Sequence, residues 1–168
     1  MLRDMGEQRP PIDYIQRTTD QYSALGYPLY RWVESETPPP WARLRKPLAE
    51  SRLALIASGG IHLSGQVAFH FKDDISYREI DTTAPESELR ISHFAYDVSD
   101  ARSDPNVVFP VGPLRRLVGE GRLGELARRA YTFMGGIYSA RKVRDVLAPA
   151  LADRVVQDEV DLVLLVPV

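Results

Sequence analysis

The stretch Leu162-Val163-Leu164-Leu165-Val166-Pro167-Val168 decides the fold class of this chain. Seven apolar residues in a row, bounded upstream by Asp158, Glu159 and Asp161, predict a strand buried on both faces, as in a parallel α/β sheet. Reactive groups in such sheets lie just past the carboxyl ends of the strands. The sequence reaches Val168 at that point, so we expect either that something outside these 168 residues completes the strand or that the site lies elsewhere.

The residues before this strand predict a βαβ unit. Residues 131–134 have the pattern of a strand, and Gly135-Gly136 suits its turn. Ser139 suits the N-cap of a helix that runs to Gln157, and Pro149 is expected either to kink this helix or to start a second piece of it. A connection of this kind crosses over right-handedly between strands of one sheet, so we expect parallel pairing.

Earlier segments add strands and helices to the same layer. Residues 53–57 form an apolar run that ends in the turn Ser58-Gly59-Gly60. Shorter strand patterns lie at residues 77–80 and 89–93, and two short helix patterns lie at residues 114–118 and 123–127. The sequence therefore predicts an α/β domain over residues 51–168, mainly parallel and Rossmann-like with flanking helices. Residues 1–50 are expected to form a helical and irregular arm.

Composition restricts the class of protein. With 21 Lys and Arg against 23 Asp and Glu, the net charge of -2 argues against a general grip on nucleic acid. No segment has the length of a membrane span or the apolar centre of a signal peptide, so we expect a cytoplasmic protein that contacts neither membrane nor nucleic acid. The chain contains no cysteine, which removes disulfides, thiolate catalysis and thiolate metal ligands from these 168 residues.

All of the candidate site residues follow or end a predicted strand, where one crevice can collect them. They are Gly59, Gly60, His62, Arg78, His93, Tyr96, Asp97, Gly135 and Gly136. Arg78 beside Glu79 suits either a substrate carboxylate or a strand-end ion pair.

A metal site at His93 is the less favoured alternative for this region. His93, Asp97 and Asp100 together offer mixed nitrogen and oxygen ligands. A histidine near acidic residues is more often part of a structural hydrogen bond, and no characteristic ligand spacing is present, so we expect no metal.

Several motifs resemble one known family. They are Ser58-Gly59-Gly60-Ile61-His62, Ser76-Tyr77-Arg78-Glu79-Ile80, Ile91-Ser92-His93-Phe94-Ala95-Tyr96-Asp97, Asn106-Val107-Val108-Phe109-Pro110 and Phe133-Met134-Gly135. In this order they resemble selenoprotein B of the glycine, sarcosine and betaine reductases, and also the related small subunit of D-proline reductase. The resemblance extends from about Arg52 to Val168.

The resemblance implies a reductase subunit that cleaves a carbon–nitrogen bond in a small amino acid or amine. It also implies a pyruvoyl group on a partner subunit and a selenocysteine or cysteine, in a Sec/Cys-x-x-Cys segment directly after the strand that ends at Val168. The sequence stops before that segment, which leaves the α/β domain open to continuation. A stop-like selenocysteine codon, a short relative and a split gene are three explanations between which the sequence does not choose.

Two functional classes remain open, together with a weaker third. The first is the reductase subunit, which lacks its nucleophile in these 168 residues. The second is a non-catalytic assembly or binding subunit that holds a small anion near Gly135-Gly136 and the helix start at Ser139. The third is a metal-dependent hydrolase using the His93 region. An apolar terminal strand needs both faces covered, so we also expect a homo-oligomer or a partner reductase subunit bound at residues 162–168.

Overall fold

The computed structural model describes residues 13–168, and the chain divides into two compact units, Met1–Pro40 and Trp41–Val168. In the first unit, helix α1 (Tyr14–Ala24) begins at Asp13, whose side chain accepts a hydrogen bond from the Gln16 N–H. No residue of α1 is buried. The rings of Tyr14 and Trp32 instead pack edge to face, with centroids 5.7 Å apart. Residues 13–40 are therefore held by aromatic contacts and contain no buried side chain.

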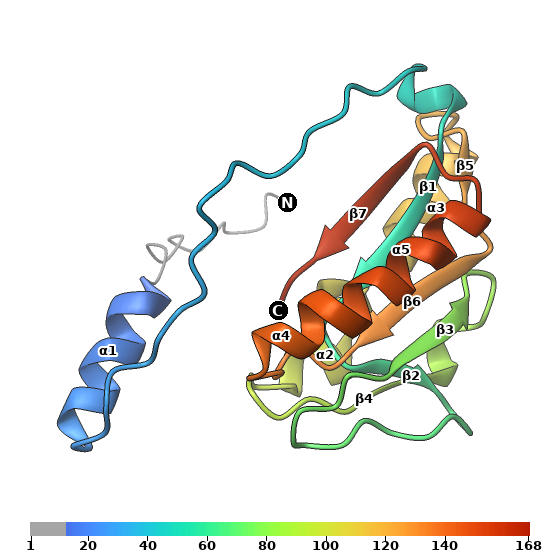
Figure 1. The fold of residues 1–168 in the computed structure, drawn as a ribbon. Helices are drawn as coiled ribbons and strands as arrows, with labels where there is room; N and C mark the ends of the chain where they lie inside the picture. The colour runs from blue at the N-terminus through green and yellow to red at the C-terminus, as the bar shows by residue number, and fades with distance from the viewer. Residues whose placement is uncertain (1–12) are drawn as a thin grey trace, which may run out of the picture. The chain divides into compact units, whose positions relative to one another are not determined.

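The second unit is built around one mixed sheet (Figure 1). Its strands are β1 (Arg52–Ala57), β3 (Tyr77–Asp81), β5 (Glu125–Leu126), β6 (Arg129–Phe133) and β7 (Leu162–Val166). Strand β1 is central and pairs in parallel with β5, β6 and β7, while β3 pairs antiparallel with β6. A separate antiparallel pair consists of β2 (Ile61–Leu63) and β4 (Leu89–Ile91). The predicted α/β class is confirmed, but the mainly parallel, Rossmann-like sheet is not, because the sheet is mixed.

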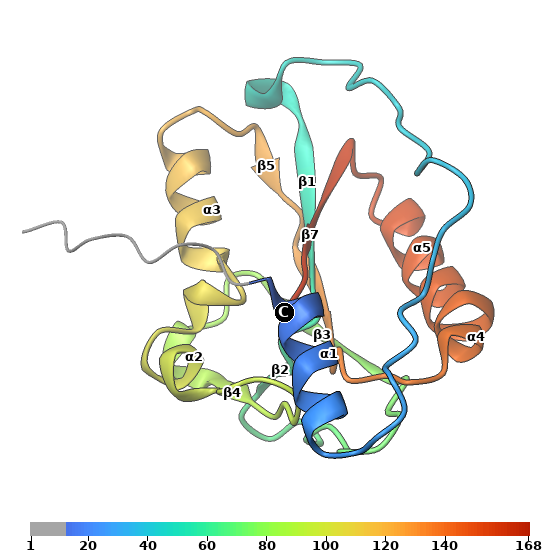
Figure 2. The same cartoon turned by 90° about the vertical axis from the view of Figure 1, so that its left-hand side faces the viewer.

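Helices cover both faces of this sheet (Figure 2). On one face lie α2 (Ser99–Ser103) and α3 (Val111–Gly119). On the other lies a continuous helix of three parts, α4 (Ala140–Lys142), the π segment η4 (Val143–Leu147) and α5 (Ala148–Gln157). Short 3-10 turns complete the unit at η1 (Leu48–Glu50), η2 (Glu86–Glu88) and η3 (Pro105–Val107). Among residues 13–168, no helix combines the length and the apolar character that crossing a bilayer requires.

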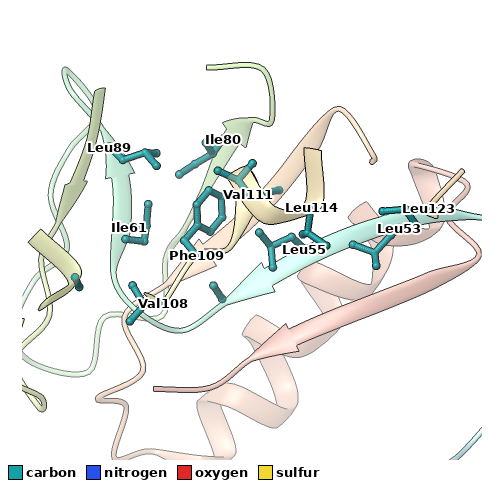
Figure 3. Close-up of a cluster of buried hydrophobic side chains, with 13 residues drawn as sticks. Leu53, Leu55, Ile61, Ile80, Leu89, Val108, Phe109, Val111, Leu114 and Leu123 are labelled. Atoms are coloured by element: carbon teal, nitrogen blue, oxygen red, sulfur yellow. The ribbon is translucent and has the colours of Figure 1, made fainter. Parts of the chain in front are cut away.

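The core is divided by the sheet into two clusters. The larger one fills the α3 face, where Phe109 and Leu55 are fully buried and face Ile61 and Val111 (Figure 3). The smaller one joins β1 and β6 to the α5 face and includes Ile56, Tyr131, Leu147 and Leu151. Strand β1 therefore presents side chains to both clusters, which explains its nearly uniform burial.

Strand β7 differs from its sequence prediction. Leu162, Leu164 and Val166 pack against the larger core cluster, but Val163 and Leu165 are 37% and 66% exposed. The prediction of a strand buried on both faces is therefore wrong for the described residues. The cause is position, since β7 pairs with β1 alone and lies at the edge of the sheet.

The predicted helix at residues 123–127 is also wrong. A side chain at Gly124 would place its Cβ atom 2.7 Å from the Ser51 nitrogen, so this segment passes directly beside the start of β1. The Ala127 N–H donates to the Leu53 carbonyl, and residues 125–126 become strand β5. Sheet pairing has replaced a helical pattern that was only one turn long.

A buried carboxylate joins the end of α5 to the sheet. Asp158 accepts a hydrogen bond from the Tyr131 hydroxyl at 2.5 Å and forms an ion pair with Arg129. Burial alone would raise the pKa of Asp158, but the hydrogen bonds from Arg129 and Tyr131 outweigh it and hold the pKa below its ordinary value. Burial and the same carboxylate raise the pKa of Tyr131.

Replacing this carboxylate is expected to destabilise the fold. Asp158→Asn should lower the free energy of unfolding by about 2 kcal/mol, because the buried tyrosine and the arginine lose a charged acceptor. A lowered carboxyl pKa stabilises the folded state above the ordinary carboxyl range, and this contribution is lost as the pH falls through that range. In urea unfolding, the difference in the free energy of unfolding between the parent and Asp158→Asn should therefore become smaller as the pH falls. The matched control is Asp153→Asn, exposed on the same helix, and equal losses for both variants would contradict the assignment.

Candidate functional site

Three chain segments meet at the carboxyl ends of β1, β6 and β7. We call the residues Ser58, Gly59, Gly60, Gly135 and Gly136 the glycine-turn cluster. The Gly135 N–H donates to the Ser58 carbonyl at 2.9 Å, and the Gly60 N–H donates to the Phe133 carbonyl at 3.0 Å. The turns that follow β1 and β6 are thus hydrogen-bonded to each other.

The segment that leaves β7 is fixed to the same cluster. The Val168 N–H donates to the Ser58 hydroxyl oxygen at 2.9 Å, and the Ser58 N–H donates to the Val166 carbonyl at 3.0 Å. A side chain at Gly59 would place its Cβ atom 3.0 Å from Val108 Cβ and 3.4 Å from Val168 Cγ2. Gly59 therefore packs closely against Val108, and Val168 lies at ordinary contact distance from the same position.

Tyr96 and His93 extend the cluster on the α2 side. The Tyr96 hydroxyl donates to the Gly59 carbonyl at 3.1 Å, and its ring lies 4.5 Å from the ring of His93. Burial raises the pKa of Tyr96, against the opposing charge of Arg102, so the hydroxyl stays protonated as this donor. The loop that carries His93 and Tyr96 therefore contacts the turn after β1.

His93 is buried with one ring nitrogen unpaired. Its Nδ1 atom accepts a hydrogen bond from the Ala95 N–H at 3.1 Å, which assigns the proton of the neutral ring to Nε2. Within residues 13–168 the buried Nε2 atom has no hydrogen-bond partner. Burial lowers the pKa of His93 below its ordinary value of 6.5.

This burial predicts a pH dependence of stability. A lowered histidine pKa means that the unfolded chain binds a proton more readily, so stability is lost as the pH falls below about 6.5. We expect His93→Asn, which keeps an acceptor for the Ala95 N–H, to flatten that loss in urea unfolding between pH 7 and about 5. The NMR titration midpoint of His93 in the parent should lie below 6.5, and a midpoint above it would contradict the burial argument.

The remaining predicted site residues have structural contacts elsewhere. His62, on β2, is buried between the Ser92 hydroxyl at 3.0 Å and the Leu63 carbonyl. Arg78 donates to the Val67 carbonyl at 2.7 Å and lies over the ring of Phe69, so it holds the loop after β2. Its neighbour Glu79 pairs with Arg154 rather than with Arg78, so the strand-end ion pair is not formed, whereas binding of a substrate carboxylate by Arg78 stays a prediction. The exposed Asp97 accepts from Ser99 and caps its own turn.

The glycine turn after β6 has no free backbone donor for an anion. The Gly136 N–H points at the Met134 sulfur at 3.1 Å, and the Ile137 N–H donates to the Gly135 carbonyl. The Tyr138 N–H donates to Asp73 at 2.7 Å. The N–H groups of Gly136, Ile137 and Tyr138 are therefore occupied, and an anion at the helix start at Ser139 stays a prediction.

The metal alternative likewise lacks its ligands in the described part of the chain. Across residues 13–168, no three acidic or histidine side chains gather as a metal site would require. Sequence reasoning also missed Ser58 as a site residue, although it precedes the two glycines directly. Its role depends on its contact with Val168, more than a hundred residues away, and a local pattern carries no signal for that.

Comparison with known proteins supplies the family. A family model described as glycine/sarcosine/betaine reductase selenoprotein B matches residues 33–168. D-proline reductase subunit gamma of Acetoanaerobium sticklandii is 35% identical over 130 residues, which cover 77% of this chain and 54% of that protein. The chain thus spans about half the length of this relative. No solved structure matches. The resemblance found in the motifs is confirmed, and the chain belongs to the glycine/sarcosine/betaine reductase selenoprotein B family.

Proposed function

We propose that this chain is a subunit of a reductase that cleaves a carbon–nitrogen bond in a small amino acid or amine of the glycine, sarcosine, betaine or D-proline type. Membership of the selenoprotein B family supports the reaction class, and the 35% identity to a D-proline reductase subunit supports the substrate class. Cleavage of this kind breaks one carbon–nitrogen bond, adds a hydrogen to the carbon and a proton to the nitrogen, and oxidises a dithiol to a disulfide; an acyclic substrate releases its amine, whereas the ring of D-proline is opened.

The observation that carries the proposal is the hydrogen bond between the Val168 N–H and the Ser58 hydroxyl. It fixes the end of β7 beside Gly59, at the edge of the sheet where α/β proteins place reacting groups. A residue joined to the Val168 carbonyl would begin at this edge. The small size of Gly59 suits such a residue, because a side chain there would fill the space that Val108 and Val168 border.

The nucleophile itself is not among these 168 residues, because the chain has no cysteine. A selenocysteine or cysteine following this edge would supply a polarizable nucleophile for carbon, and a pyruvoyl group on a partner subunit would activate the amine. The residues of this chain would act as its support. Ser58 anchors Val168, and the neutral Tyr96 hydroxyl holds the Gly59 carbonyl in place.

A chimera tests the proposal. Residues 33–168 of this chain would replace the matching part of D-proline reductase subunit gamma, whose remaining residues are kept, and the chimera would be combined with the other subunits of that reductase. We expect dithiol-dependent consumption of D-proline above that of the mixture without any gamma subunit. A chimera that assembles with those subunits and supports no turnover would count against the reductase proposal.

The non-catalytic assembly subunit is the second candidate. The absence of cysteine in these 168 residues favours it, since nothing in the chain can perform the attack. It predicts a chimera that assembles normally while turnover depends only on the retained residues of the gamma subunit, so that changes in the glycine-turn cluster leave the rate unchanged.

A further inference from the structure

His62 is a buried histidine whose two ring nitrogens are both hydrogen-bonded. It lies on β2 and is only 8% exposed. Its Nδ1 atom lies 3.2 Å from the Leu63 carbonyl oxygen, and its Nε2 atom lies 3.0 Å from the Ser92 hydroxyl oxygen. A carbonyl oxygen only accepts, so Nδ1 of the neutral ring carries the proton and Nε2 accepts from Ser92. The Ser92 hydroxyl is therefore held in one orientation by a buried acceptor.

Strand β2 is fixed in position, because both of its ends are bonded to the main sheet. The Ile61 carbonyl accepts from the Thr132 hydroxyl on β6, and the Ile61 side chain points into the larger core cluster (Figure 3). The Leu63 N–H donates to the Gln66 side chain, which in turn donates to the Glu79 carbonyl on β3. A three-residue strand held at both ends gives the buried ring that it carries a rigid position.

Ser92 is the first residue after β4, where the chain leaves the strand pair and starts the loop that ends on the glycine-turn cluster. Its N–H donates to the Gly60 carbonyl at 2.9 Å. An added Cβ atom at Gly60 would lie 2.2 Å from the Ser92 carbonyl oxygen, so the two backbones are in direct contact. At the other end of this loop, the Tyr96 hydroxyl donates to the Gly59 carbonyl. The loop is therefore fixed to the turn after β1 at both of its ends.

We propose that His62 is a positioning residue for the carboxyl edge of the sheet. By accepting from the Ser92 hydroxyl, it sets the direction in which residues 93–96 leave β4, and thereby the position of Tyr96 beside the Gly59 carbonyl. Both hydrogen bonds of the ring lie outside the glycine-turn cluster, so it acts on the edge through Ser92. Its effect on turnover rests on the proposed reductase function, whereas its effect on the loop belongs to the fold alone.

Two amide variants separate this role from the mere burial of a polar side chain. In His62→Gln the longer side chain places its amide oxygen near the position of Nε2, where it can accept from Ser92. In His62→Asn the shorter side chain reaches only the position of Nδ1, so the Ser92 hydroxyl loses its acceptor. The two variants have the same polar group, and circular dichroism should show both folded. His70→Asn is the control, since His70 is exposed on the following loop.

Amide hydrogen exchange in the 168-residue chain tests the effect on the loop. The Ala95 N–H, which donates to His93 Nδ1, should exchange at least about tenfold faster in His62→Asn, while the amides of β1 keep their rates. His62→Gln and His70→Asn should leave the exchange of Ala95 close to that of the parent. Equal exchange of Ala95 in the parent and in His62→Asn, or equal acceleration in both amide variants, would overturn the positioning role.

Turnover of the chimera tests the effect on the edge. In His62→Asn, kcat should fall at least about tenfold while KM changes by less than about threefold, and His62→Gln should recover most of the loss. Ser92→Ala should lower kcat by a similar factor, and adding it to His62→Asn should lower kcat little further, because both act through one hydrogen bond. Fully multiplied losses in the double variant would overturn the route through Ser92. A parent chimera without turnover would instead count against the reductase function, and the exchange of Ala95 would still decide the role of His62.

Discussion

Purified alone, the 168-residue chain is expected to cleave no carbon–nitrogen bond of glycine, sarcosine, betaine or D-proline, even with a dithiol reductant present. Attack on the carbon of a carbon–nitrogen bond needs a polarizable nucleophile that is ionised near neutral pH, and thiolate and selenolate meet both conditions. The chain contains no cysteine. The side-chain hydroxyl at the carboxyl edge of the sheet belongs to Ser58. Its oxygen accepts a hydrogen bond from the Val168 N–H, and no basic side chain is assigned to deprotonate it.

The effect is all or nothing, so the assay needs a sensitive readout and a firm control. Amine release from glycine, sarcosine and betaine, and ring opening of D-proline, should equal the rates in buffer with reductant alone. D-proline reductase with its own gamma subunit serves as the positive control for assay conditions. Cleavage by the isolated chain above the buffer rate would mean that another group performs the attack, and the carboxyl edge would lose its chemical role.

The second large effect is expected at Gly60. Its φ of +70° lies in the left-handed region, and an added Cβ atom would lie 2.2 Å from the Ser92 carbonyl oxygen. The Gly60 carbonyl also accepts the Ser92 N–H, so β4 cannot move away without breaking this contact. Left-handed backbone costs a side chain about 1–2 kcal/mol, and a clash with backbone atoms adds at least as much. Gly60→Ala should therefore lose about 3 kcal/mol or more.

Gly65→Ala separates the two causes. Gly65 has a φ of +92°, and nothing lies within 4 Å of its added Cβ atom, so this variant shows the backbone cost alone. Urea unfolding should place Gly60→Ala clearly below Gly65→Ala. Equal urea midpoints for the two variants would mean that β4 shifts without cost. The close contact between Gly60 and Ser92 would then not constrain the fold.

The elements that could be predicted from sequence are those whose signal is local. The apolar run at residues 53–57 became β1, and the capped pattern from Ser139 became the helix that ends at Gln157. Pro149 did not break this helix, because a π segment directly before it accommodates the missing N–H.

The elements that were missed depend on contacts distant in sequence. Nothing local distinguishes a buried parallel strand from an apolar edge strand, so the position of β7 could not be derived from its composition. The helical pattern at residues 123–127 was overridden by pairing with β1. In both cases the neighbouring strand decided the outcome.

The candidate site follows the same division. Glycines after strands predicted two turns, and both turns lie together in the cluster with Tyr96 and His93. Arg78 and Asp97 had equally suitable chemistry, yet their side chains hold loops elsewhere. Sequence spacing locates strand ends, whereas hydrogen-bond partners decide which side chains are free to act.

The turnover of the chimera carrying Gly59→Val tests the central claim most directly, namely that the edge formed by Ser58, Gly59 and Val168 positions the reacting segment. A valine at Gly59 would press on Val108 and reach the end of β7 at Val168, and a displacement of about 1 Å in an active site can lower a rate by about a hundredfold. Gly119→Val is the control, because its added Cβ atom would meet nothing within 4 Å. We predict a loss of at least about tenfold for Gly59→Val, with assembly intact, and a near-parental rate for Gly119→Val. Equal rates for the parent chimera and both variants would contradict the claim.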